Sequence, residues 1–447
     1  MVSNLHIFEQ LNEVMKKYIS GFSKLTKKEK IKWITKLYFE DSLKAESELK
    51  KYWNSDTEIQ QIHDEFIENT LSNFYMPFGV APNFIIDGKD YTLPMVIEES
   101  SVVAAASKTA KYWSRRGGFH TKILNIEKSG QIHFLFDGNK NEIDEFFKKN
   151  KKQLLESCFD ISLKMTKRGG GIQSIELIDK TSDLKNYFQI SVHFITIDAM
   201  GANFINSCLE KISKTLNNLF IKSNLNEKYK LEIIMSIMSN HVPNCLVKGW
   251  ASCSIKDLDE NDSINGRQFA EKFVNAINIS KIDLNRAVTN NKGIMNGIDS
   301  LVLSTGNDFR AVEASIHAFA AKNGKYKGLT NAFIKDKMFT IELTIPLSIG
   351  TVGGLTKLHP LVRWSMDLLG NPNAKELMSI ICVSGLAQNF AAVRSLITSG
   401  IQKGHMKLHL LNILNQLKAS KKEKKDALLF FIDKEVNYTN VEKFLNR

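Results

Sequence analysis

Segments that alternate polar and apolar residues are the feature that most limits how this chain can fold. They lie in the middle of the sequence, where strand-like runs are separated by stretches with a helical pattern. The strand-like runs are residues 119–136, 172–179, 187–197, 229–239 and 244–255, with helices expected at about 140–157 and from Ala202. This β-α-β-β-α-β succession predicts a small α+β domain with an antiparallel sheet. Ser129 and Gly130 are expected to form a hairpin turn in the first run.

The sequence on either side of this region is mostly helical. Helices are expected at residues 5–50, 60–73, 101–114, 375–399 and 405–447, and strands at 300–304 and 338–349. Three prolines and two glycines in residues 74–100 predict strands and turns instead of a helix. Arg115–Gly118 interrupts the pattern and predicts a domain boundary. A chain of 447 residues is long enough for two or three domains.

The composition describes a basic chain without disulfide or membrane signatures. A net charge of +12 indicates an anionic partner, for which nucleic acid and phosphorylated cofactors are both candidates. Nucleic acid ranks last, because no basic patch is interleaved with aromatic residues. Five cysteines without a CxxC pair are typical of a reduced, cytoplasmic protein. The first residues do not form a signal peptide pattern, and no run of about 18 apolar residues predicts a membrane span.

A glycine turn between a strand and a helix is the first candidate site. Asp198, Met200, Gly201 and Asn203 lie where the strand ends and the helix begins. The start of a helix presents unpaired N–H groups and a positive dipole end, and Gly201 lets an anion approach the backbone closely. A pyrophosphate cradle is therefore one interpretation. The pattern is not the GxGxxG motif of a Rossmann domain, and a helix cap by Asp198 is the alternative.

Charged residues beside glycines and before a helix form two further candidate sites. Lys292 and Asp308 flank an apolar run, and a lysine near a carboxylate in a dry site can donate to a developing oxyanion. Glu98 and Glu99 directly precede the helix expected at 101–114. Adjacent acids point in different directions, so at most one is expected to be catalytic, with its pKa tuned by burial. Capping and surface positions are the alternatives.

A histidine between two glycines is the last candidate. Gly400 and Gly404 permit hinge motion around His405, and a mobile histidine can act as an acid or base near neutral pH. His409 follows at a spacing of four, but no HExxH pattern or third ligand accompanies the two histidines, so no metal site is predicted. Residues 350–354, which follow a strand, form either a structural turn or a backbone-lined cradle.

An ordered set of motifs resembles the class II, bacterial-type reductases of 3-hydroxy-3-methylglutaryl-CoA. The motifs are GVAPNF (79–84), MVIEESSVVAAAS (95–107), DAMGAN (198–203), NKGIMNGID (291–299), TGNDFRAVEA (305–314), GTVGG (350–354), LAQNFAAVRSL (386–396) and GIQKGHM (400–406). Each motif is weak alone, and their common order and spacing carry the resemblance over most of the chain.

The resemblance implies catalytic roles for four residues. Glu99 matches a glutamate that acts in proton transfer, and Lys292 matches a lysine that stabilises the carbonyl oxyanion. Asp308 matches an aspartate between these groups that tunes them, and His405 matches a histidine on a mobile flap that protonates the departing CoA thiolate. The implied reaction interconverts (S)-3-hydroxy-3-methylglutaryl-CoA and mevalonate plus CoA by two successive hydride transfers from NAD(P)H. It belongs to the mevalonate pathway of isoprenoid biosynthesis.

The resemblance also implies which residues bind substrate and cofactor. Ser101, Arg286 and Asn296 match residues that hold the hydroxymethylglutaryl group, and Arg286 can pair with its free carboxylate. The dinucleotide would be contacted by Asp198, Met200, Gly201 and Asn203. Coenzyme A enters as part of the substrate, and no metal is implied.

The implied fold is α+β with a small domain inserted into a large one. The large, mostly helical domain for CoA and substrate covers residues 1–118 and 245–399. The small NAD(P)-binding domain covers 119–244 and is ferredoxin-like, not Rossmann-type. Residues 400–447 form a C-terminal helical flap with the catalytic histidine. The family is built on a homodimer, without a nucleic-acid partner and, in its bacterial form, without a membrane anchor.

Three departures from the family pattern leave an alternative open. Ser23 replaces a basic residue associated with CoA phosphates, Ser72 replaces glycine, and Ser100 replaces proline. They motivate the alternative of a non-catalytic homologue that binds CoA or a dinucleotide. The choice between NAD and NADP, and the physiological direction, are left open by the sequence.

Overall fold

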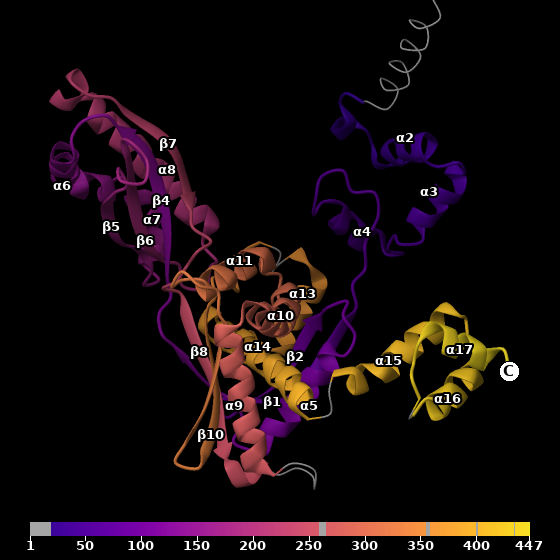
Figure 1. The fold of residues 1–447 in the computed structure, drawn as a ribbon. Helices are drawn as coiled ribbons and strands as arrows, with labels where there is room; N and C mark the ends of the chain where they lie inside the picture. Colours follow the sequence, from indigo (N-terminus) through magenta and orange to yellow (C-terminus); the bar gives the residue numbers. More distant parts are fainter. Residues whose placement is uncertain (1–18, 259–264, 355–357, 399–400, 433) are drawn as a thin grey trace, which may run out of the picture. The chain divides into compact units, whose positions relative to one another are not determined.

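The first of two compact units is a small helical segment. The computed structural model describes residues 19–258, 265–354, 358–398, 401–432 and 434–447, without the side chains of 401–408. The chain divides into residues 1–77 and 78–447 (Figure 1). The described part of the first unit contains α2 (Lys27–Tyr38), α3 (Ser42–Lys50) and α4 (Thr57–Asp64). Lys27 joins α2 to α4 through its Nζ, 2.7 Å from Asp64 Oδ1. The helix expected from residue 5 begins outside the described residues.

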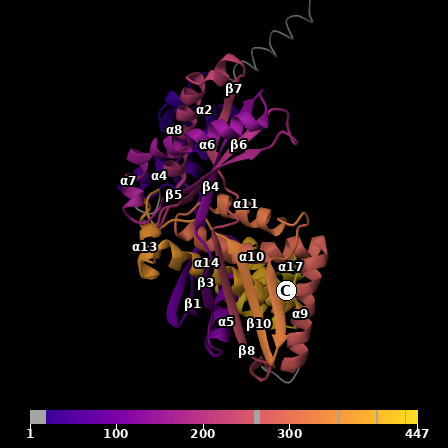
Figure 2. The same cartoon turned by 90° about the vertical axis from the view of Figure 1, so that its left-hand side faces the viewer.

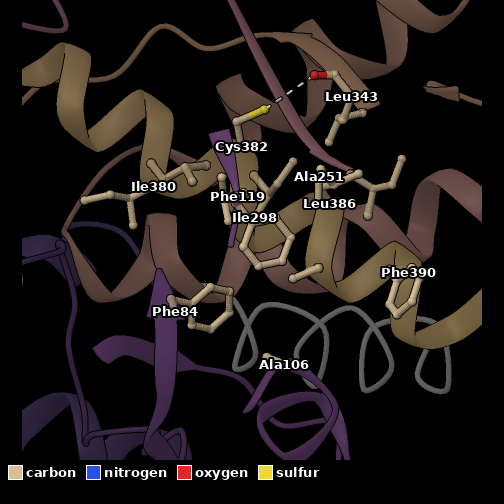
Figure 3. Packing of buried hydrophobic residues seen from close by; sticks show 14 of the residues in the cluster. Phe84, Ala106, Phe119, Ala251, Ile298, Leu343, Ile380, Cys382, Leu386 and Phe390 are labelled. Carbon is tan, nitrogen blue, oxygen red and sulfur yellow. Dashed lines mark hydrogen bonds between the residues drawn. The ribbon is translucent and has the colours of Figure 1, made fainter. Parts of the chain in front are cut away.

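Helices packed against a hairpin form the centre of the second unit. The strands β1 (Phe78–Ile86) and β2 (Lys89–Val96) are antiparallel, and α5 (Val102–Ser114) packs on β1. The long helix α10 (Leu284–Ser304) packs on β2 and on α14 (Ala374–Ile397). Figure 3 shows the resulting core, where Phe84, Phe119, Ile298 and Phe390 lie around α14. These buried apolar faces explain why Ala- and Leu-rich segments form helices here.

A four-stranded antiparallel sheet extends this core. Its spatial order is β3-β8-β10-β9. The strands are β3 (His120–Ile123), β8 (Leu246–Ser254), β9 (Thr330–Lys335) and β10 (Met338–Pro346). The neighbouring helices are α9 (Gly266–Ile282), α11 (Phe309–Ala320) and α13 (Pro360–Leu368). Cys382 of α14 contacts this sheet, and its thiol donates to the Leu343 carbonyl at 3.7 Å (Figure 3).

A second four-stranded sheet has its own core. Its order is β5-β6-β4-β7, and all neighbours are antiparallel (Figure 2). The elements are β4 (Glu127–Phe136), α6 (Lys140–Glu156), α7 (Phe159–Thr166), β5 (Gly171–Asp179), β6 (Tyr187–Ile195), α8 (Ala202–Ile221) and β7 (Leu231–Met238). Burial alternates strictly along β4, so Ile132, Phe134 and Phe136 point to the same face of the sheet. There they pack in one apolar cluster with side chains of α6 and α8.

The C-terminal helices build a third apolar cluster. They are α15 (Ile401–Gln416), α16 (Lys421–Phe430) and α17 (Tyr438–Leu445). Leu410, Leu414, Ala427, Phe431 and Val441 are buried among them. Ser420 and Asn437 are the N-caps of α16 and α17, and their side chains accept hydrogen bonds from the first turn of each helix. These caps explain where the two helices begin in a polar sequence.

Several local predictions were wrong. The helix expected at 60–73 ends at Asp64, and the strand run 119–136 is divided between β3, which pairs with β8 in the first sheet, and β4 in the second sheet. Ser129 and Gly130 form no hairpin turn but lie inside β4, whose pairing partners are β6 and β7. Gly130 is glycine because a Cβ there would lie 2.5 Å from Leu209 Cδ1 of α8. The strand expected at 300–304 is the last turn of α10, where Leu301 and Val302 are fully buried. A short apolar run fits a buried helix as well as a strand.

Helix α14 is long and apolar enough to cross a bilayer by composition alone. Its most apolar window has a mean hydropathy of 1.5, and 67% of that window is buried inside the protein. A capping box of Asn373 and Glu376 begins the helix. The packing of Leu377, Ile381 and Phe390 into the core accounts for its apolar sequence.

Two glycines of α10 offer a matched test of the contact between α10 and α14. A Cβ at Gly297 would collide with the Ser384 carbonyl group, whereas a Cβ at Gly293 would meet only Ala392 Cβ at 3.9 Å. Gly297→Ala should lower the free energy of unfolding by about 1–3 kcal/mol through overpacking. Gly293→Ala should be neutral or stabilising, because alanine favours a helix by about 1 kcal/mol over glycine. Urea unfolding curves check this, and equal effects at both positions would contradict it.

Candidate active site

An ion pair between Lys292 and Glu99 joins the middle of α10 to the end of the hairpin. Ser304 Oγ, at the end of α10, donates to the Pro94 carbonyl of β2 at 2.9 Å. From there α10 runs back about 18 Å to Lys292. The chain leaves β2 after Val96 and turns toward α5, and Glu99 lies in this turn. The Lys292 ammonium and Glu99 Oε2 therefore meet as an ion pair.

This pair is accessible to a ligand. The Lys292 side chain is 58% exposed and that of Glu99 is 39% exposed. Glu98 is more exposed than Glu99, so Glu99 is the acid that faces the lysine. Of the two adjacent acids, Glu99 is thus the one that contacts Lys292, and its catalytic role stays a prediction. An exposed ion pair contributes little to stability, which leaves both groups free to exchange partners.

The turn that carries Glu99 contains a strained residue. Ser101 precedes α5 with a φ of 76°, in the left-handed region that residues other than glycine rarely adopt. Such backbone strain clusters at ligand sites, where the surrounding structure holds it in place. Ser101 and Glu99 thus share one short connection between β2 and α5.

Asp308 lies at the start of α11. Its Oδ1 accepts hydrogen bonds from Arg310 N at 3.1 Å and Ala311 N at 3.2 Å, and Arg310 Nε lies 3.5 Å away. The preceding residue, Asn307, accepts a hydrogen bond from Gly350 N at 2.8 Å. The contacts described for Asp308 are thus those of a helix cap. They do not join it to Lys292 or Glu99.

One face of α10 carries Lys292, Asn296 and Asp299 at spacings of four and three residues. Burial first, and then a hydrogen bond with Glu313, raise the pKa of Asp299 to about 8. Burial and the neighbouring Glu313 of α11 therefore both favour the protonated form of Asp299. The sequence analysis did not single out this pair, although two acids in adjacent, largely apolar motifs were visible.

Arg286 lies in the first turn of α10, about 120° around the helix from Lys292. Its side chain is partly buried, which lowers its pKa from the ordinary value. Its Nη2 lies 3.5 Å from Asn290 Oδ1, and Asn290 in turn accepts from Asn389 Nδ2 at 3.0 Å. Asn290 and Asn389 thus orient the Arg286 guanidinium through a chain of two hydrogen bonds. None of the described contacts joins Arg286 to Lys292 or Glu99.

The predicted cofactor loop is pressed against the turn after β10. Asp198 Oδ1 accepts from Ala374 N, the first residue of α14, at 2.9 Å. The Asp198 carbonyl accepts from Thr351 N at 2.8 Å. A Cβ at Gly350 would collide with the Met200 nitrogen, so only glycine fits there. The Asp198 carboxylate thus accepts from the start of α14 and does not cap α8, whose N-cap is Gly201, so the predicted capping of the helix near Ala202 was wrong.

Gly201 is the N-cap of α8, in the turn that the sequence offered as a pyrophosphate cradle. It has a φ of 102°, and a Cβ there would lie 2.6 Å from Thr196 Cγ2. Gly201 is buried, whereas Asn203 is exposed in the first turn of this 20-residue helix. The predicted role of both residues in cofactor binding stays a prediction.

Lys128 of β4 contacts this loop, and the sequence analysis did not identify it as a residue of the site. It is 4% exposed, and its Nζ donates to Thr196 Oγ1 at 2.7 Å and to the carbonyls of Ala199 and Met200, both at 2.9 Å. Burial lowers the pKa of this ammonium to about 8. The sequence does not show that this lysine is buried or hydrogen-bonded to the loop, because its acceptors lie about 70 residues further along the chain.

The side chain of His405 lies outside the described residues, so its predicted role on the C-terminal segment stays a prediction. Within the ranges that the structure describes, no group of three or more His, Cys, Asp and Glu side chains is placed to hold a metal ion.

A mixed α/β chain that holds a lysine and a glutamate together in an accessible pair has the groups that an enzyme needs to stabilise a developing oxyanion. The family model described as hydroxymethylglutaryl-coenzyme A reductase matches residues 26–410. The chain therefore belongs to the hydroxymethylglutaryl-coenzyme A reductase family.

Relatives and solved structures agree with this assignment. The chain is 36% identical over 409 residues to the 3-hydroxy-3-methylglutaryl-coenzyme A reductase of Archaeoglobus fulgidus, covering 90% of this chain and 88% of the relative. It is 34% identical to a probable reductase of Borreliella burgdorferi, covering 79% and 78%. A class II reductase structure from Streptococcus pneumoniae, bound to NADPH in open conformations, has a TM-score of 0.70 at 36% identity, covering 86% and 91%.

The Asp299–Glu313 pair predicts a pH-dependent stability. The unfolded aspartate has a pKa near 4, so between about pH 4 and 8 the folded state keeps a proton that the unfolded state releases. The free energy of unfolding therefore falls as pH rises through this window. Between pH 6 and 9 the wild type should lose about 2 kcal/mol more than Asp299→Asn, whose amide cannot titrate.

Urea unfolding of both proteins at the two pH values measures this difference. The exposed Asp90→Asn on β2 is the matched control and should keep the wild-type dependence on pH. Parallel dependences for the wild type and Asp299→Asn would contradict the raised pKa of Asp299.

Proposed function

We propose that the chain interconverts (S)-3-hydroxy-3-methylglutaryl-CoA and mevalonate plus CoA, with Lys292 and Glu99 at the reacting carbonyl. The accessible Lys292–Glu99 pair is the single observation that carries this proposal. The pair brings together, across 193 residues of sequence, the two groups that the family resemblance assigns to oxyanion stabilisation and proton transfer. The assembled pair favours a catalytic protein over a non-catalytic homologue, because it has the two groups that the reaction needs.

Lys292 supplies positive charge where negative charge develops. As a thioester or aldehyde carbonyl is reduced, its oxygen becomes an alkoxide, and a preorganised ammonium stabilises that charge. Lys292 is paired with an exposed carboxylate, so a substrate oxygen can take the place of one Glu99 contact. Glu99 is the anion of this pair, so it must first take a proton from solvent before it can pass one to the alkoxide.

Asp308 and His405 complete the proposed catalytic set. Asp308 begins α11, one residue after the Asn307–Gly350 hydrogen bond, and an approach to Lys292 requires a change in its helix-capping contacts. His405 protonates the CoA thiolate as it leaves, because a thiolate needs an acid and histidine supplies one at neutral pH. Ser101, Arg286 and Asn296 hold the hydroxymethylglutaryl group, and the guanidinium of Arg286 pairs with its free carboxylate.

The second sheet and α8 bind the nicotinamide cofactor. Two NAD(P)H molecules, bound in turn, would each supply one hydride, one for each reduction step. Gly201 and the first turn of α8 would hold the pyrophosphate together with Met200 and Asn203, and Asp198 fixes the loop through its bond to α14. Lys164, Lys167 and Arg168, at and after the end of α7, are candidates to select NADP through its 2′-phosphate.

Three separate apolar clusters support a division into domains. We assign residues 1–118 and 245–399 to CoA and substrate, and residues 400–447 to the flap. The cofactor domain of about 119–244 has the β-α-β-β-α-β succession and ferredoxin-like strand order, with its own core from β4 onward. We further propose a homodimer in the cytoplasm, and the five buried, free thiols are in keeping with a reducing compartment.

Loss of Lys292 tests the oxyanion role. Lys292→Ala should lower kcat by about 10²–10³-fold or more, because one preorganised donor contributes that much to catalysis. Exposed Lys272→Ala, on neighbouring α9, is the matched control and should be unchanged. The measurement is oxidation of NADPH and NADH at 340 nm with hydroxymethylglutaryl-CoA. Wild type inactive with both cofactors would refute the function, and full activity of Lys292→Ala would refute the role.

The thiolate acid can be separated from the hydride steps by the choice of substrate. His405→Gln should slow reduction of the CoA thioester by about 10²–10⁴-fold, the usual contribution of a general acid. It should reduce free mevaldehyde at close to the wild-type rate, because that substrate releases no thiolate. Equal losses with both substrates would contradict the role of His405.

A further inference from the structure

Lys128 is a buried cation without a carboxylate partner in the described part of the chain. Its three N–H donors are matched by three oxygens, those of the Thr196 side chain and of the Ala199 and Met200 carbonyls. The titratable group whose charge acts on it is the Cys245 thiol, whose own burial raises its pKa to about 11, so it is neutral. Burying an uncompensated ammonium is costly, so its position calls for a physical reason.

The bonds of Lys128 set the direction of the neighbouring N–H groups. A trans peptide is planar, and its C=O and N–H point to opposite sides. With the Met200 carbonyl held on Lys128, the Gly201 N–H points away from the lysine. Gly201 begins α8, so its N–H adds to the unpaired donors at the positive end of that helix. Thr196, which also contacts Gly201 closely, holds the other side of the same loop.

From these contacts we propose that Lys128 is a positioning residue for the dinucleotide: it fixes the Ala199–Gly201 backbone so that α8 receives the pyrophosphate, and its charge adds to the attraction. The inference rests on the proposed function, because it concerns the cofactor of that reaction. The lysine acts through the loop and its field, without touching the substrate.

The charge of Lys128 makes dinucleotide affinity depend on pH. Burial lowers the pKa of Lys128 to about 8, so the ammonium loses its proton as pH rises through this value. A bound pyrophosphate favours the charged form and raises that pKa. Affinity for the dinucleotide should therefore be greatest below pH 8 and should fall above it.

The test compares direct binding with steady-state kinetics in three variants. Lys128→Met keeps the length of the side chain without its charge, and Thr196→Val removes one of the three acceptors with little change of shape. Lys214→Met replaces an exposed lysine on α8 and is the control. Calorimetry with NADPH, NADH and ADP-ribose from pH 6.5 to 9.5 gives the affinities, and kinetics give KM for hydroxymethylglutaryl-CoA.

Lys128→Met should weaken binding of all three probes roughly 10- to 100-fold and abolish the fall above pH 8, as expected for the loss of charge-assisted hydrogen bonds. Thr196→Val should weaken binding by a few-fold and keep the dependence on pH. Lys214→Met should match the wild type. The KM for hydroxymethylglutaryl-CoA should stay within about twofold in all three.

Unchanged probe affinity in a folded Lys128→Met overturns the inference, and so does an equal rise of KM for hydroxymethylglutaryl-CoA. If Lys128→Met does not fold, Thr196→Val decides, and wild-type affinity in that variant overturns the inference. A wild type that binds NADPH without turnover refutes the proposed function while the binding series still tests Lys128. A wild type that turns over, with Lys128→Met unaffected, refutes only the role of Lys128.

Discussion

The close contact of Gly350 with the Asp198–Met200 backbone is the constraint on which the rest of the candidate site depends. Gly350 N donates to Asn307 Oδ1 at 2.8 Å, and its Cα side faces the Met200 nitrogen with no room for a Cβ. Thr351 N donates to the Asp198 carbonyl, and Asp198 Oδ1 accepts from the start of α14. The loop before Asp308 and the loop before α8 are therefore tied through one turn. A displacement of one loop should displace the other, because the contact between Gly350 and the Met200 backbone leaves less room for adjustment than a contact between flexible side chains.

Periodicity predicted most of the second sheet, and two of its failures have a common cause. Alternation identified β4, β5, β6 and β7, and the glycine turn identified the start of α8. Ser129 and Gly130 have the chemistry of a turn, yet Gly130 is small because Leu209 packs against it. Leu301 and Val302 have the composition of a strand, yet they fill the contact of α10 with the core. Tertiary packing determined the secondary structure at both places, and packing cannot be read from the pattern of neighbouring residues.

Family motifs pointed to residues that the fold brings together, whereas a single side chain that reaches across the fold gave no signal in the sequence. Glu99 and Lys292 were named from their motifs and form an ion pair, which the sequence did not predict, and their catalytic roles stay predictions. The described contacts leave Asp308 as a helix cap and Arg286 among asparagines, so their roles stay predictions. Lys128 and the Asp299–Glu313 pair were missed, because the meaning of each charge comes from burial and from partners on other elements.

The two lysines differ in the way their roles require. Lys292 is largely exposed and paired with a mobile carboxylate, and such a pair exchanges partners at little cost in free energy. Lys128 is buried, and its three oxygens are fixed by a strand end and a helix start. Releasing Lys128 would leave a buried cation without its acceptors, which is costly in a low dielectric, while the Ala199 carbonyl would keep its hydrogen bond from Thr196 Oγ1. In the proposed roles, Lys292 responds to a reacting oxygen, whereas Lys128 holds a shape and a field that exist before any ligand arrives.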